Sequence, residues 1–196
     1  MGSIFSKVNN VLMGWSIMPG WFAIGALPVL HAAVYSTIVS ALLPMMENGG
    51  LSSVQAFIQA RSGHLLEGDR LALAAVFCSL LLHLGTFYPF LFVSSFRGVD
   101  NQTPRKSRPA DGSLAGRLYA CHLNQAESFP YFAAAVLAAV VLGKGAAVAS
   151  LAWIHIGFRV AYFMCYAGNL PNLRTFVFCG SFHCSVLAFA AALRNP

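Results

Sequence analysis

Three residues that could do chemistry stand inside an apolar run that continues to Leu142: Arg117, Asn124 and Glu127. In a helix, which turns by about 100° per residue, one face carries Arg117, Cys121, Asn124 and Ser128, with Ala120 and Glu127 beside it. A carboxylate at membrane depth costs about 2.5 kcal/mol or more on insertion scales. The sequence therefore predicts that other segments bring cations or hydroxyls to the depth of Glu127.

Two later apolar segments carry groups of that kind. One narrow helical stripe in the first of them consists of His155, Arg159, Tyr162 and Tyr166. The second segment opens with Arg174 and Thr175. Three segments together therefore supply arginines, a carboxylate, a carboxamide, two phenols and a hydroxyl.

Two interpretations of these groups are open. In the first, they neutralise one another: Glu127 and Arg159 form an ion pair between helices and the tyrosines cap it, as polar groups do in membrane bundles. In the second, the surplus arginines bind an anionic guest or a lipid headgroup. One carboxylate does not need three arginines, and the planar guanidinium suits a carboxylate or a phosphate.

The composition places these segments in a membrane. Of 196 residues, 58% are hydrophobic and only 9% are charged, whereas a soluble domain has about 25% charged residues. The formal net charge of +6 is spread over the flanks of apolar runs, without the basic stripe that favours nucleic acid. The five cysteines and six histidines show no metal-ligand spacing. We therefore expect an integral, multi-pass membrane protein with neither metal nor nucleic acid as partner; the sequence does not distinguish the endoplasmic reticulum from an organelle inner membrane.

Five apolar runs are long enough to cross a bilayer: residues 21–43, 71–94, 118–142, 146–167 and 174–193. The turns between the last three runs are too short for anything but antiparallel neighbours. The sequence thus predicts an all-α fold, in which residues 70–196 form an integral membrane four-helix antiparallel bundle. Residues 1–69 are predicted to be an N-terminal extension with an extra membrane helix (21–43) and an amphipathic segment (51–66).

The amphipathic segment 51–66 has apolar residues at helical spacing opposite glutamines and Arg61. This pattern fits either a short helix lying in the membrane interface or a connector packed on the bundle.

The loop 97–117 is rich in arginine and lysine, which favours the cytoplasmic side or its equivalent in an organelle. By alternation, the third run starts, the fourth ends and the fifth starts on that side. Glu127, Arg159 and Arg174 are therefore predicted to converge in the same half of the membrane.

These residues resemble a known family. One signature, Arg-x3-Ala-His-x-Asn-x2-Glu-x2-Pro, is matched with Cys121 at the alanine position by Arg117, Cys121, His122, Asn124, Glu127 and Pro130. A companion signature is matched by Arg159, Tyr162, Tyr166 and, after a short turn, Arg174. Together they look like the membrane-associated proteins in eicosanoid and glutathione metabolism (MAPEG), in the bacterial and plant-like branch. The resemblance covers about residues 70–193.

The resemblance implies a four-helix bundle that assembles as a homotrimer and, in members that are enzymes, binds glutathione between subunits. It implies a glutathione site made of Arg117, Asn124, Glu127, Arg159, Tyr162 and Tyr166. It also implies that Arg174 holds the thiolate, with Thr175 where some members have serine. Ala120 and Leu123 depart from the pattern, because several glutathione-using members carry arginine there.

Two functions of different kinds follow. The first is a glutathione transferase or peroxidase that acts on lipophilic substrates. The second is a non-catalytic accessory subunit of a larger membrane complex, with a vestigial or lipid-filled site. The additional predicted span at 21–43 favours the second, because it adds contact surface that the family bundle does not need.

Overall fold

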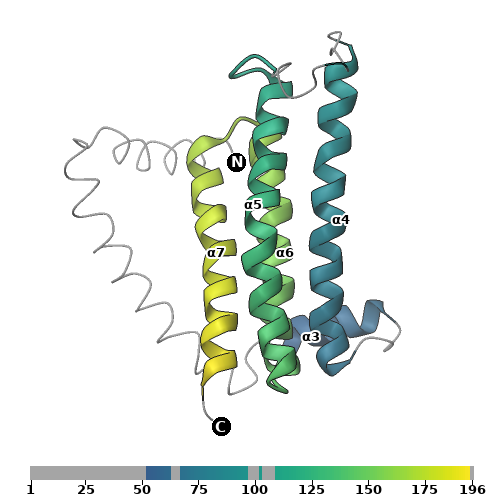
Figure 1. Ribbon diagram of the computed structural model, residues 1–196, viewed down its shortest axis with the longest axis vertical. Helices are drawn as coiled ribbons and strands as arrows, with labels where there is room; N and C mark the ends of the chain where they lie inside the picture. The colour runs from purple at the N-terminus through teal and green to yellow at the C-terminus, as the bar shows by residue number, and fades with distance from the viewer. Residues whose placement is uncertain (1–51, 63–66, 97–101, 103–108, 195–196) are drawn as a thin grey trace, which may run out of the picture. The chain divides into compact units, whose positions relative to one another are not determined.

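The computed structural model describes residues 52–62, 67–96, 102 and 109–194 (Figure 1). This part of the chain holds five helices and no strand: α3 (Ser52–Arg61), α4 (Gly68–Ser95), α5 (Leu114–Val141), α6 (Gly145–Ala167) and α7 (Pro171–Leu193). The predicted all-α class is therefore confirmed for the described residues. The predicted span 21–43 lies outside them.

The four long helices lie side by side in Figure 1, and the chain reverses direction at each connection between them. They correspond to the four predicted runs from residue 71 onward. Among the described residues, three helices are long and apolar enough to cross a membrane: α4, α6 and α7. Helix α5 is as long as α4, but the polar residues of its first half lower its hydropathy.

The helix α3 lies across the end of the bundle where α4 begins (Figure 1). The side-chain amide of Gln55 donates a hydrogen bond to the carbonyl of Ala146, at 3.0 Å, and Ile58 packs against the core of the bundle. Phe57 stays exposed, and the guanidinium of Arg61 lies 5.2 Å from the centre of its ring. One face of α3 therefore packs on the bundle, as expected of a connector, while its other face carries an exposed aromatic ring.

Local signals in the sequence set the helix ends. The hydroxyl of Ser113 accepts a hydrogen bond from the Gly116 amide at 3.0 Å, which caps the start of α5. Between α6 and α7 the backbone of Asn169 takes a positive φ of 53°, a conformation that asparagine tolerates better than most residues. Pro171 then opens α7, at a position where its missing N–H costs nothing.

Small residues bring the helices close together. Alanines supply much of the core between α4, α5 and α6, where Ala72, Ala75, Ala149 and Ala152 surround Phe132 and Val136. At the start of α6, Gly145 leaves room for the carboxylate of Asp69, a negative charge that suits a helix N-terminus. The starts of α4 and α6 therefore meet at one end of the bundle, and the two helices run parallel.

Candidate functional site

Arg159 is the centre of the polar interior. Its side chain is 1% exposed. Its Nε donates to Oε1 of Gln125 at 2.6 Å, and Nη1 and Nη2 each donate to Oδ1 of Asn124 at 3.1 Å. The guanidinium also lies 4.5 Å from the centre of the Tyr162 ring. Two amide oxygens and an aromatic face thus surround this buried charge.

This arrangement fixes Asn124 as well as Arg159. Because the side-chain oxygen of Asn124 accepts both guanidinium bonds, its amide nitrogen is directed away from Arg159. Asn124 is half-buried, whereas Arg159 is enclosed by its own chain. In this chain Arg159 therefore positions Asn124, and Asn124 offers the accessible donor.

A second group of side chains adjoins the first through Tyr162. Its hydroxyl donates to the hydroxyl of Tyr166 at 3.5 Å, and the two rings meet edge to face. The guanidinium of Arg174 lies over the other ring, 4.6 Å from the centre of Tyr166. Cation–π contacts link arginine to tyrosine at both places, so Arg159, Tyr162, Tyr166 and Arg174 form a continuous row.

Arg117 ties the end of α6 to the start of α5. Its Nε donates to the carbonyl of Tyr166 at 2.9 Å, Nη2 to that of Ala167 at 3.4 Å, and Nη1 to that of Gly112 at 2.7 Å. The last carbonyls of a helix lack partners within the helix and carry partial negative charge. Arg117 therefore stabilises the C-terminus of α6.

Glu127 lies apart from these groups. It is exposed on the outer face of α5, and among the described residues it forms no ion pair. The ion pair that the sequence predicted with Arg159 or Arg174 is therefore not formed within the described part of one chain. The reason is the rotation of α5, which turns Cys121, Gln125 and Ser128 inward. A partner from a neighbouring subunit stays a prediction.

Thr175 is exposed in the first turn of α7, where its hydroxyl donates to the carbonyl of Pro171 at 3.2 Å. Of the residues predicted from the sequence, the structure brings together Arg117, Asn124, Arg159, Tyr162, Tyr166 and Arg174. It leaves Glu127 and Thr175 on the surface of the single chain.

Gln125 is the residue of this cluster that the sequence interpretation missed. It is 1% exposed, accepts the shortest bond from Arg159, and its Nε2 donates to Oγ of Ser79 in α4 at 3.4 Å. The signal was present, because Gln125 lies one turn from both Cys121 and Ser128 on the inward face of α5.

A second missed feature is a pair of histidines. The rings of His83 and His122 stack with centres 4.5 Å apart, and Oγ1 of Thr86 lies 3.4 Å from Nδ1 of His122. This contact joins α4 to α5.

The fold and this cluster define a class: a helical membrane protein with an arginine-rich polar interior in one half of its bundle. The model of the MAPEG family matches residues 71–194, which is more than half of the chain and includes every residue of the cluster. The chain belongs to the MAPEG family. No curated protein and no solved structure gave a significant match to the chain.

Proposed function

We propose that this protein binds glutathione beside the arginine row and uses it to modify lipophilic substrates, as a glutathione transferase or peroxidase. One observation carries the proposal: among the described residues, Arg117, Arg159 and Arg174 form no ion pair. Three cations without a counter-charge in one half of a membrane bundle favour an anionic ligand. Glutathione is anionic, and the family match supports a glutathione-related protein.

Each accessible group of the cluster has a role in this proposal. Arg174 is half-buried and supplies the positive charge beside the sulfur, which lowers the pKa of a thiol and creates the nucleophile. Thr175 stands next to it. The amide of Asn124 and the hydroxyl of Tyr166 bind the peptide, and Glu127 complements its ammonium group. The thiolate then forms a carbon–sulfur bond to an electrophile, whose leaving group departs with the electron pair.

We also propose that copies of the chain associate, as a homotrimer, through the outer face of α5. That face consists of exposed residues at helical spacing: Leu123, Ala126, Glu127, Pro130, Ala134, Leu137 and Val141. It is apolar except for one carboxylate, and a carboxylate in a membrane requires a partner. A cation from a second copy would meet that requirement and would place Glu127 at a site between subunits.

In the membrane, we propose that α4 to α7 all cross as an antiparallel bundle, with α5 included despite its polar residues. The polar side chains of α5 that point inward support this proposal. Gln125 and Ser128 are buried between helices, where hydrocarbon does not reach them. The basic loop before α5 then faces the cytoplasm or its organelle equivalent.

A second candidate function is a non-catalytic accessory subunit of a larger membrane complex, with lipid near Arg174. Two observations favour it: the guanidinium of Arg159 is enclosed, and that of Arg117 binds backbone carbonyls. Two of the three arginines therefore already hold helices together.

A binding experiment separates the two functions. The purified protein is titrated with glutathione in lipid nanodiscs while binding, thiolate absorbance and turnover of a lipophilic electrophile are followed. We expect binding at millimolar glutathione, and we expect Arg174→Leu to abolish the thiolate signal while the helices stay folded. The control is Arg70→Leu. Arg70 is exposed in the first turn of α4, at the end of the bundle away from the arginine row. If the unmodified protein does not bind glutathione, the enzyme proposal fails and the accessory function is favoured.

A further inference from the structure

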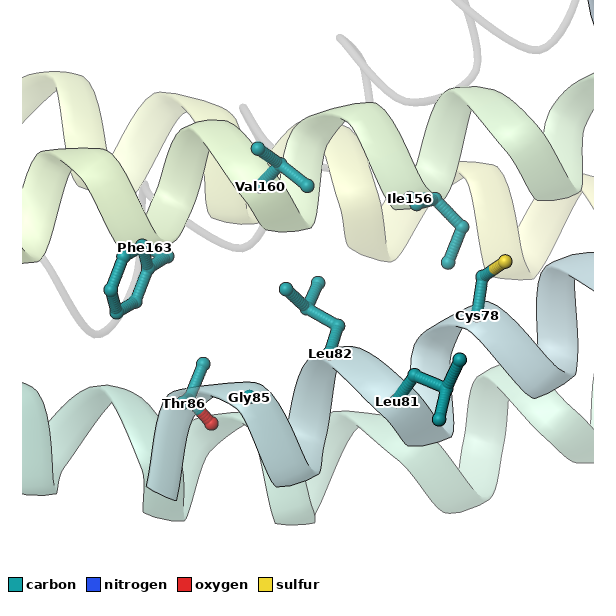
Figure 2. Close-up of a pocket in the computed structure, with 8 residues that line it drawn as sticks. All are labelled: Cys78, Leu81, Leu82, Gly85, Thr86, Ile156, Val160 and Phe163. Atoms are coloured by element: carbon teal, nitrogen blue, oxygen red, sulfur yellow. The ribbon is translucent and has the colours of Figure 1, made fainter. Parts of the chain in front are cut away.

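A groove runs between α4 and α6 on the outside of the bundle, with a volume of about 350 Å³. Its α4 wall consists of Cys78, Leu81, Leu82, Gly85 and Thr86, and Figure 2 shows Leu82 pointing toward the α6 side. The α6 wall consists of Ile156, Val160 and Phe163. No residue of either wall is charged, so the groove suits an apolar occupant.

The groove opens to the surroundings of the bundle. Leu81 is 48% exposed and Val160 is 46% exposed, and both belong to helices that are apolar enough to cross a membrane. With α4 and α6 crossing the membrane as proposed, the groove opens toward lipid and not toward water. Its chemistry excludes an ionised ligand, for which a carboxylate or a guanidinium would be required inside.

Gly85 gives the groove its depth. A Cβ placed on Gly85 would meet no atom within 4 Å. At Gly180 of α7, by contrast, glycine allows a close contact, because a Cβ there would lie 2.7 Å from the Phe158 ring. Glycine inside a helix costs about 0.5–1 kcal/mol relative to alanine in water. Close packing therefore does not require a glycine at position 85, and the absence of a side chain there leaves open space in the groove.

The shape of the groove matches a single hydrocarbon chain. From Cys78 to Thr86 it follows α4 for about 12 Å, at 1.5 Å per residue. Because it follows helices that we propose to cross the membrane, a lipid chain can lie along it without turning away from its neighbours. The parallel direction of α4 and α6 places Thr86 and Phe163 nearer the ends of their helices, in the half of the bundle that holds the arginine row.

We propose that the α4–α6 groove binds one acyl chain of a membrane lipid from the leaflet on the side of the arginine row. The terminal methyl group lies near Cys78 and Ile156, and the middle of the chain passes Thr86 and Phe163. This site is separate from the proposed glutathione site, and it does not depend on glutathione binding.

The test uses the full chain in phosphatidylcholine vesicles that contain a trace of phosphatidylcholine with a photoactivatable diazirine in one acyl chain. A diazirine near the terminal methyl should label Cys78 and Ile156, and one at mid-chain should label Thr86 and Phe163, as read by mass spectrometry of peptides. The exposed residue Phe77, on α4 but outside the groove, reports labelling by surrounding lipid. We expect the groove to be labelled several-fold more strongly than Phe77.

Filling the groove should remove this label. Gly85→Leu puts a side chain into the open space and should reduce labelling of Thr86 and Phe163 several-fold without changing that of Phe77. Gly157→Leu is the matched control, because a Cβ on Gly157 also meets no atom within 4 Å and Gly157 does not line the groove. If Gly85→Leu does not fold, Val160→Phe fills the groove from the other wall.

Two results would overturn the proposal. One is equal labelling of the groove and Phe77 that neither filling variant changes, which would mean ordinary surrounding lipid. The other is loss of the groove label when a lipophilic electrophile, 1-chloro-2,4-dinitrobenzene, is added to the vesicles. That loss would assign the groove to a small lipophilic compound instead of a lipid chain.

Discussion

Arg159 shows how a single charge is accommodated inside this bundle. Burying two opposite charges costs the hydration of both, and their attraction does not always compensate for it. Here the guanidinium meets the neutral oxygens of Gln125 and Asn124 and the face of Tyr162. Charge-assisted hydrogen bonds of this kind are stronger than bonds between neutral groups.

We therefore expect Gln125, which accepts the hydrogen bond from Nε of Arg159, to contribute to the stability of the fold. Gln125→Leu keeps the size of the side chain but removes the acceptor for Nε of Arg159, and it should destabilise the protein by about 1–3 kcal/mol. Thermal unfolding in detergent measures the effect. Adding Arg159→Met should restore part of the loss, because the unpaired charge is then gone; no recovery in the double variant would contradict this account.

The ring of Tyr166 is expected to hold Arg174 in place. Tyr166→Phe keeps the ring and removes the hydroxyl, whereas Tyr166→Leu removes the face that the guanidinium covers. If glutathione binds as proposed, Tyr166→Leu should weaken its affinity more than Tyr166→Phe, by about 0.5–2 kcal/mol for a cation–π contact. Titration calorimetry compares the two variants, and equal losses would show that the hydroxyl is the group that matters.

The helices were predictable because their ends carry strong local signals. Gly143 and Gly145 mark the turn between the third and fourth runs, and residues 168–172 were predicted as the next turn, although Pro171 already opens α7. The predicted runs 146–167 and 174–193 lie within three residues of α6 and α7. What could not be predicted is how each helix is rotated about its axis. That rotation is set by packing, in which buried alanines of α4 and α6 fit around Phe132 and Val136 of α5.

The candidate site shows the consequence of that rotation. Its members could be found from type and spacing, and Asn124, Arg159, Tyr162, Tyr166 and Arg174 do lie together. Their partners could not, because Gln125 and Glu127 lie about 160° apart around the axis of α5, and only the packing of the helix decides which of the two faces Arg159. The sequence interpretation paired opposite charges, whereas the packing placed an amide there.

Two glycines should respond to the same substitution with opposite signs. Gly180→Ala places a methyl group 2.7 Å from the Phe158 ring and should destabilise the contact of α6 with α7. Gly157→Ala meets open space, and it should be neutral or stabilising by up to about 1 kcal/mol. Unfolding in detergent measures both. Phe158→Leu should relieve the first effect, and a failure to do so would show that the clash lies elsewhere.

Over the whole bundle, buried polar groups link the helices, and one outer face carries a carboxylate. Hydrogen bonds between buried side chains link all four long helices: Gln125 to Ser79, Arg159 to Gln125, and His155 to Ser185. Most of the exposed surface of α4 consists of leucine and phenylalanine, as expected of a helix that faces lipid. The outer face of α5 differs, because Glu127 stands in the middle of it.

Glu127 should therefore control association of the chains and not the fold of one chain. A carboxylate on an otherwise apolar membrane face is stabilised when a cation of another copy reaches it. Glu127→Gln keeps the shape of the side chain and removes the charge, so it should shift the population from oligomer to monomer while the helical content stays the same. Mass photometry in detergent gives the populations, and circular dichroism gives the helical content. Glu67→Gln is the control, since Glu67 is also exposed but precedes the first turn of α4, away from this face. An oligomer that persists unchanged in Glu127→Gln would show that the carboxylate does not hold the subunits together.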